Sequence, residues 1–222
     1  MKVVIQVVLW LIIGFLGYKV YDSVSGPVRF NKIKEERYRA VIKNLKDIRT
    51  AQLAHQEITG NFAGTYDSLI QFIDTAQFAI TVRRDTSYAD VEKNRAFGLD
   101  EGYYIEDIVV DTIGYAAVKD SLFGSTDRYK TMMNVPVEGL DAKFELQSGK
   151  QEKNEIEYSV FMARVAKSVI LSDQPEDLVL QENAAKSVEE VNGRFIQVGS
   201  MDKIDTSGNW PKLYDTNEEN QQ

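Results

Sequence analysis

The chain of 222 residues has a formal net charge of -8, one histidine and no cysteine. This length suits one ordinary domain plus an anchor, and the lack of cysteine excludes disulfides, thiolate metal sites and cysteine nucleophiles. Residues 1–49 hold ten Lys and Arg against four acids, so the rest of the chain carries about -14 by subtraction. A basic start suits lipid phosphates, whereas an acidic remainder argues against nucleic-acid binding, which needs a basic patch on the folded part.

The first predicted element is a membrane-spanning anchor over residues 1–22. Its apolar run, interrupted only by Gln6, extends to Tyr21. About 19 residues make about 28 Å of helix, close to the hydrocarbon thickness of a bilayer. No small-residue cleavage site follows, which favours an uncleaved anchor over a signal peptide. The predicted anchor residues, which contact the lipid bilayer or its interface, are Val3, Trp10, Phe15, Tyr18, Lys19 and Tyr21.

Two signals disagree on the orientation of this anchor. Basic residues after it favour a cytoplasmic domain by the positive-inside rule. In contrast, only Met1 and Lys2 precede the span, which is typical of a signal anchor with its N-terminus inside. Flanking charge alone leaves both orientations open.

Beyond the anchor, Gly26-Pro27 predicts a break or kink and hence a juxtamembrane linker over residues 23–30. A long amphipathic helix is expected from about Asn31 to Thr59, ended by Gly60. Its apolar stripe has the 3-4 spacing of one helix face, which packs on the chain's own sheet or, as the alternative, on a partner. The stripe consists of Tyr38, Val41, Leu45 and Ile48, with Ala51 and Ala54 near the same contact.

The remaining pattern predicts one short helix followed by strands. Thr65 can cap a helix that runs to about Asp74. Strands are expected at 78–82, 103–110, 114–118, 143–146, 155–165, 169–171 and 195–198, the first of them forming a hairpin or meander. Helices first and strands afterwards indicate an α+β domain over residues 31–204 with a mainly antiparallel sheet. From about Asp205 the polar composition predicts a C-terminal tail over 205–222.

The sequence offers no reaction centre. The single histidine, His55, excludes multi-histidine metal sites, and no glycine-rich phosphate loop is present. The acidic pairs lack the spacing of a calcium loop. We therefore predict no catalytic residue, cofactor, metal or small-molecule substrate.

Two stretches resemble known families. Residues 45–55 and 57–70, which include Thr59-Gly60 and Phe62, resemble the helix exit of type II secretion pseudopilins and type IV pilin-like proteins. This resemblance implies a membrane helix that continues outward into a head domain outside the cytoplasm. The sequence departs from the pilin leader pattern, because its one Gly-Phe pair, Gly14-Phe15, lies inside the apolar run.

A wider similarity covers most of the chain, and it is carried by residues 83–85, 120–123, 127–136, 143–146 and 208–211. On these motifs the chain is similar to an uncharacterised family of short membrane-anchored proteins of Bacteroidota. This similarity implies a bacterial envelope setting and no particular activity.

These observations leave three functional hypotheses. The leading one is a single-pass protein of the bacterial inner membrane, with a periplasmic domain and protein partners in the envelope, that has a structural or assembly role in a membrane machine. The second is a tethered module that binds a peptide or protein through an exposed strand edge after Phe78. The third, ranked last, is a tethered enzyme that uses carboxylates such as Asp107 or Asp111.

Overall fold

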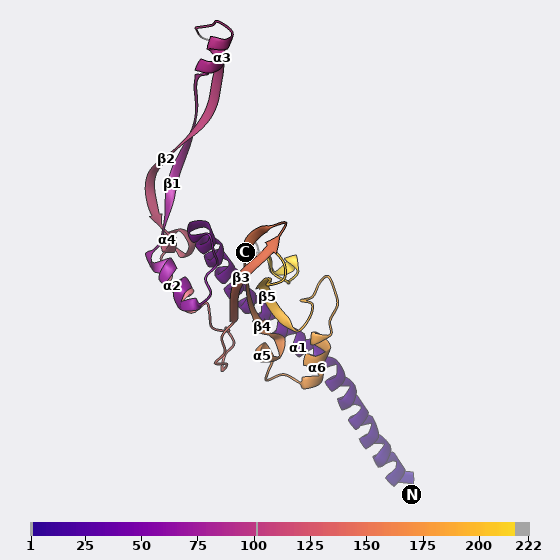
Figure 1. The fold of residues 1–222 in the computed structure, drawn as a ribbon. Coiled ribbons are helices and arrows are strands. Elements are labelled where there is room, and N and C mark those ends of the chain that lie inside the picture. The colour runs from indigo at the N-terminus through magenta and orange to yellow at the C-terminus, as the bar shows by residue number, and fades with distance from the viewer. Residues whose placement is uncertain (1, 101, 216–222) are drawn as a thin grey trace. The chain divides into compact units, whose positions relative to one another are not determined.

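The computed structural model describes residues 2–100 and 102–215 and has the α+β architecture expected from the sequence (Figure 1). The chain divides into two compact units. The first unit comprises Met1–Leu69 and Asp127–Gln222, and the second comprises Ile70–Thr126. Each is described by itself.

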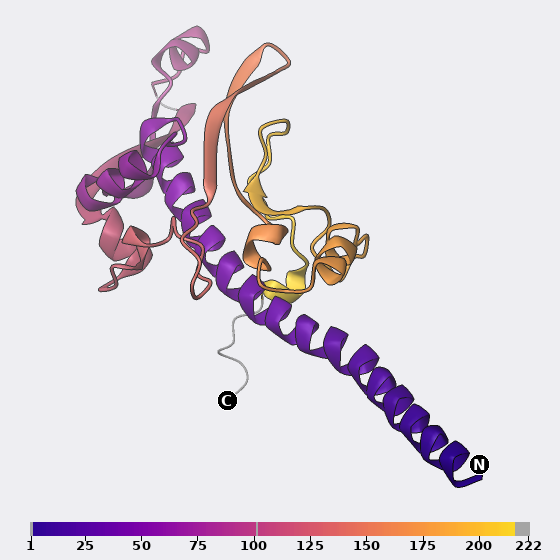
Figure 2. The same ribbon diagram turned by 90° about the horizontal axis from the view of Figure 1, so that it is seen from below.

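The first unit is built on helix α1, Lys2–Thr59, which has 58 residues. At 1.5 Å per residue this helix is about 87 Å long. Its first part is long and apolar enough to cross a membrane, and no residue of that apolar window is buried. Its second part is the spine on which the rest of the unit packs (Figure 2).

The expected break at Gly26-Pro27 and the linker over residues 23–30 are wrong, because these residues are helical and Pro27 lies inside α1. A proline within a helix removes the hydrogen bond to the carbonyl four residues earlier, here that of Ser23, at a cost of about 3 kcal/mol. Both flanking segments are strongly helical, and Pro27 is exposed, so water or lipid headgroups can solvate the freed carbonyl.

The second part of α1 buries one face against a three-stranded antiparallel sheet. The order of this sheet is β3 (Glu145–Lys153), β4 (Ile156–Ala166) and β5 (Phe195–Gly199). Helix α1 packs against β4 and β5. Every member of the stripe is at most 4 % exposed: Tyr38, Val41, Leu45, Ile48, Ala51 and Ala54. The stripe therefore lies in the core of this unit.

Helix α1 ends at Thr59, and Gly60 adopts a positive φ of 79° just after it. The chain then folds back onto α1 through the buried side chain of Gln52. The Gln52 amide donates to the Ala63 carbonyl at 2.9 Å and accepts from the Ala63 N–H at 2.8 Å. Next to it, the Phe62 ring lies 4.6 Å from that of Phe161 on β4, between centroids. The turn is thereby fixed to both the helix and the sheet.

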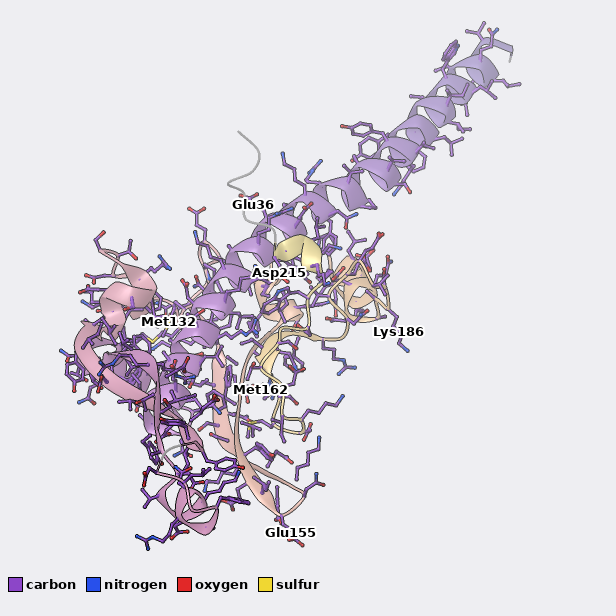
Figure 3. The ribbon with its side chains drawn as sticks, turned by 90° about the horizontal axis from the view of Figure 1, so that it is seen from above. Glu36, Met132, Glu155, Met162, Lys186 and Asp215 are labelled. Carbon is purple, nitrogen blue, oxygen red and sulfur yellow. The ribbon has the colours of Figure 1, made fainter. Side chains whose placement is uncertain are left out.

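The β3–β4 hairpin turns at Asn154 and Glu155, which have positive φ values of 55° and 63° (Figure 3). The strand expected at 169–171 is wrong. That segment belongs to helix α5, Lys167–Ile170, and its C-cap Leu171. Helix α6, Glu176–Asn183, follows.

The expected tail over 205–222 is wrong for the described residues up to 215. Gly208 bridges Val198 of β5, and the ring of Trp210, which is 9 % exposed, lies over Gly208. The Trp210 indole donates to Asp215 at 3.0 Å, and Asp215 lies 3.1 Å from Lys46 of α1 (Figure 3). A short 3-10 turn, Lys212–Tyr214, connects Trp210 to Asp215 along the chain. Residues 216–222 lie outside the described part of the chain.

The second unit is a long hairpin with short helices at its two ends. Strand β1, Gln77–Ala89, pairs antiparallel with β2, Tyr104–Ala117, and helix α3, Val91–Ala96, connects them (Figure 1). At the other end lie α4, Val118–Phe123, and the last part of α2, Tyr66–Thr75, which belongs to this unit from Ile70 onward. The Thr65 hydroxyl accepts from the Ser68 N–H at 3.2 Å, so Thr65 caps α2 as expected.

We predict that Leu45→Ala lowers the free energy of unfolding of the full-length protein in detergent by about 2 to 5 kcal/mol, because the truncation leaves a cavity at a fully buried position. Leu53 on the same helix is 37 % exposed and provides the matched control, for which Leu53→Ala should change the value by less than about 0.5 kcal/mol. Denaturant unfolding measures both. A near-neutral Leu45→Ala would contradict the packing of α1.

Candidate functional site

The hairpin of β1 and β2, which together with α3 we name the arm, is an exposed feature of the described residues. Its strands have 13 and 14 residues and, within the described residues, pair only with each other. Almost no residue along them is buried on either face. Isolated two-stranded hairpins are marginally stable in water, and each strand here has an unpaired outer edge. Such an element is typical of a surface that binds another chain.

The arm exposes large apolar side chains along both of its faces. Opposite residues of an antiparallel pair share a face, so the register assigns each side chain to one of the two. One face carries Val82, Tyr88, Ile105 and Val109, which are 38 to 52 % exposed. The other carries Tyr104, Ile108, Val110 and Tyr115, which are 53 to 69 % exposed. Neither face is covered within the described part of the chain, in contrast to an ordinary sheet, which buries one.

The tip of the arm is held by Asn94, which is 2 % exposed. Its side-chain amide donates to the Tyr103 carbonyl at 3.0 Å and accepts from the Tyr103 N–H at 2.8 Å. Asp90 caps α3 by accepting from the Lys93 N–H at 3.0 Å, and the Lys93 ammonium lies 4.3 Å from the Tyr103 ring centroid. The tip is thus ordered by local polar contacts.

The ladder is interrupted once, next to Ile80. Ile80 lies opposite Gly114 and Thr81 lies opposite Thr112, so Ile113 is an extra residue in β2 and forms a bulge. The Ile113 side chain is 65 % exposed. The segment 111–113, which we expected between two strands, is therefore part of one continuous strand with a local irregularity.

The two acids considered for catalysis lie on this exposed strand. Asp107 accepts from the N–H of Ile108 at 2.8 Å, and Asp111 forms an ion pair with Arg84 across the ladder. Asp111 is held by the cation of Arg84 and Asp107 by the backbone N–H of the next residue, as on a solvated sheet surface. Within the described residues, no group of three or more His, Cys, Asp or Glu could hold a metal ion.

The predicted anchor residues lie on the first part of α1. Their side chains point outward over successive turns of a single helix. Apolar and aromatic members are 60 to 73 % exposed: Val3, Trp10, Phe15, Tyr18 and Tyr21. Lys19 is also exposed. The stripe residues, in contrast, are brought together in the core.

A buried cluster of charged side chains fastens α1 to the segment between β4 and β5. Lys167, which is fully buried, donates to the Glu182 carboxylate at 2.9 Å and to the backbone carbonyls of Glu182 and Val191 at 2.9 and 2.5 Å. From α1, Lys34 donates to the same carboxylate at 2.8 Å and the Tyr38 hydroxyl donates to it at 3.2 Å. All three lysine protons and both carboxylate oxygens of the central pair are therefore used.

The electrostatics of this cluster follow from burial and pairing. Desolvation raises the pKa of Glu182, but the hydrogen bonds and charges of Lys34 and Lys167 outweigh it and hold the pKa below its ordinary value of 4.5. Burial, followed by the charge and hydrogen bond of Glu182, raises the pKa of Tyr38 far above its ordinary range. Glu182 is therefore ionised and Tyr38 protonated at neutral pH, as the hydrogen bonds require.

Sequence reasoning missed this cluster. Its members are separated by up to 148 residues, so no local spacing could reveal it. One signal was available: Lys167 is the only ammonium within the apolar run 165–171, and a lysine in such a run must find acceptors when it is buried. The acceptors could not have been named.

Comparisons with protein-family models, with curated proteins and with solved structures found no match for this chain.

We predict that Glu182→Gln destabilises the protein by about 3 to 5 kcal/mol, because the buried Lys167 loses its counter-charge. Glu190 provides the matched control. Its carboxylate lies 3.7 Å from the same Lys34 but is 42 % exposed, so Glu190→Gln should cost less than about 1 kcal/mol.

The pH profile identifies the cause. Because the folded pKa of Glu182 is lowered, its stabilisation is fully present above pH 4.5 and is lost as the pH falls through the lowered value. The gap between wild type and Glu182→Gln should therefore narrow below pH 4.5 in denaturant unfolding. A gap of constant size would contradict the charged pair.

Proposed function

We propose that this chain is a single-pass envelope protein with a structural or assembly role in a membrane-associated machine. The observation that carries the proposal is that α1 belongs both to the exposed apolar segment and to the folded unit. One continuous helix supplies an exposed apolar segment at its start and the buried stripe of a folded unit farther along. Such a helix couples the position of the folded unit to that of the membrane.

The exposed apolar segment supports the anchor. Every large apolar side chain from Val3 to Tyr21 is at least 49 % exposed. Soluble proteins rarely present a continuous apolar surface of this size, whereas a bilayer covers it favourably. Within the span all backbone groups can be satisfied inside the helix, as the hydrocarbon region requires.

The residues that follow the span match an interfacial zone. Tyr18 and Tyr21 are exposed at its end, where aromatic belts lie. Arg29 and Lys32 are exposed about two to three turns farther on, and basic side chains at this level suit lipid phosphates. The span, the aromatic residues and the basic residues therefore come in the order that a bilayer surface requires.

The geometry also supports the resemblance to pseudopilins. That resemblance implies a membrane helix that continues outward into a head domain, and α1 agrees with it, since its exposed first part leads into a folded unit and it ends at Thr59-Gly60. By the same resemblance we place the chain in a bacterial inner membrane, with its N-terminus inside and the residues from Val28 onward in the periplasm.

A second function is favoured by a separate observation. The unpaired edges of β1 and β2 fit a tethered module that binds a protein by adding a strand to the arm. This reading is compatible with the anchor, because a tethered arm can recruit a partner to the membrane.

We predict that the full-length chain stays in the membrane fraction after carbonate extraction and that protease added to spheroplasts digests the part after Val28. Digestion follows from a periplasmic domain with an exposed arm. A cytoplasmic protein and a known periplasmic protein serve as controls. Protection of the domain while the periplasmic control is digested would reverse the orientation, and extraction by carbonate would overturn the anchor.

A further inference from the structure

The two outer edges of the arm carry opposite charge. Strand β1 holds Arg83, Arg84 and Asp85, which sum to +1, whereas β2 holds Glu106, Asp107 and Asp111 with no basic residue, which sum to -3. Pairing β2 with a second β2 would bring acids together. Pairing the β1 edge with a β2 edge brings a basic segment to an acidic one.

We propose that the arm pairs with the arm of a second copy of this chain, with the β1 edge of one copy against the β2 edge of the next. This inference rests on the proposed assembly function and names the partner for it. The interface is heterologous, since each copy uses two different edges, and it therefore extends beyond a dimer.

The ladder of the arm defines the register of this contact. From Thr81 onward each β1 residue lies opposite a β2 residue such that their numbers sum to 193, as for Arg84 and Val109. In a pair of opposite residues that is not hydrogen-bonded within the arm, the backbone N–H and C=O groups of both residues point to the outer edges. A second arm in the same register therefore places its outward N–H and C=O groups opposite those of the first arm, where they can form hydrogen bonds.

This register places opposite charges on one face. Arg84 of the second copy lies opposite Val109 of the first, with Asp107 and Asp111 as its diagonal neighbours on the same face. Arg83 of the second copy lies on the other face, opposite Val110, with Ile108 and Thr112 as diagonal neighbours. Only Arg84 has carboxylates of the other copy beside it. Its positive charge therefore stabilises the contact, whereas the charge of Arg83 has no ionic partner there.

The direction of the strands suits anchors in one membrane. A β1 strand added antiparallel to β2 runs in the same direction as the first β1, so successive arms point the same way. Pairing of β1 with β1 in antiparallel fashion would reverse one arm. The exposed apolar residues of β2 also gain neighbours, such as Ile105 beside Tyr88 of the second copy.

Disulfide trapping tests this contact without background, because the chain has no cysteine. Full-length Thr81→Cys and Thr112→Cys variants with different tags are co-expressed in one membrane and oxidised. Both threonines are exposed and lie at matched levels. Opposite residues of adjacent strands have Cα atoms about 4.5 to 5.5 Å apart, within disulfide range, whereas two β1 strands separated by a β2 lie about 9.6 Å apart.

The expected result is a mixed disulfide between the two tags, with neither variant cross-linking to itself. Arg84→Glu in the Thr81→Cys copy should lower the yield of this disulfide about tenfold or more, since a carboxylate then faces Asp107 and Asp111 of the second copy. The same substitution in the Thr112→Cys copy also removes the ion pair of Arg84 with Asp111 within one arm, but its β1 edge lies outside the trapped contact, so the yield should stay near that of the parent. Arg83→Glu changes the net charge equally but faces no carboxylate, so the yield should stay near that of the parent.

Three outcomes would overturn the inference. A Thr81→Cys homodimer would mean two-fold pairing through β1, and equal losses for both arginine variants would remove the proposed register. The absence of any disulfide would show that the arm does not pair with itself. Carbonate extraction of the same samples separates these failures from that of the proposed function: a membrane-bound chain without disulfides leaves the anchor intact, whereas a soluble chain overturns it.

Discussion

The burial of one face of α1 is the constraint on which the first unit depends. A helix with a fully buried stripe from Tyr38 to Ala54 must be covered along about four turns, and β4 and β5 cover it. The polar contacts then lie at the margins of this face. Lys34 and Tyr38 reach Glu182, while Arg37 binds Asp173 through both of its terminal nitrogens at 2.5 and 2.8 Å. The apolar face thus provides the attraction, and the ion pairs fix the position of the segments around it.

The buried charges contribute to specificity more than to net stability. Removing Lys167 and Glu182 from water is expensive, and their pairing offsets that cost only because every donor and acceptor is used. A cluster with unpaired buried donors or acceptors would be less stable than apolar side chains in the same place. We therefore regard the cluster as the device that selects one position of α6 on α1.

Features with a local cause could be predicted from the sequence. The stripe follows from its 3-4 spacing, the end of α1 from Gly60, and the start of α2 from the hydroxyl of Thr65. The hairpin follows from β-branched and aromatic segments, although β1 extends seven residues past the expected Val82. The segment that follows Val82 is Arg83-Arg84-Asp85, which places charged side chains on both faces of the strand. It therefore lacks the alternation of apolar and polar residues that indicates a half-buried strand. The same charges keep both faces of the arm exposed.

Features with a distant cause could not be predicted. The helical context on both sides of Pro27 overrides the local rule that predicts a break. Residues 169–171 are apolar and β-branched enough to indicate a strand, yet they continue the turn that places Lys167 on its acceptors. The polar segment 205–215 packs because Trp210 and Asp215 meet Gly208 and Lys46, which its composition does not reveal.

The arm supports the proposed function through an exposure that the fold does not explain. Neither strand of the arm buries a residue, so the strands contribute little to the fold, and their length and many exposed apolar side chains call for another cause. Opposite charge on its two edges restricts the partners that it can accept. Together with the apolar start of α1, these edges suit a protein that acts by holding other chains at a membrane.

The central claim is that α1 is one uninterrupted helix from the membrane span to the core, and a spin-label distance across Pro27 tests it most directly. Tyr18 and Glu36 are both exposed and lie 18 residues apart, which is five turns, so their labels lie on the same side of the helix. The labels are attached at Tyr18→Cys and Glu36→Cys in the otherwise cysteine-free full-length chain. Pulsed electron paramagnetic resonance in lipid should give one narrow distribution of label-to-label distances, centred at about 27 Å. A broad or multimodal distribution would mean a hinge at Gly26-Pro27 and would contradict the coupling of the folded unit to the membrane.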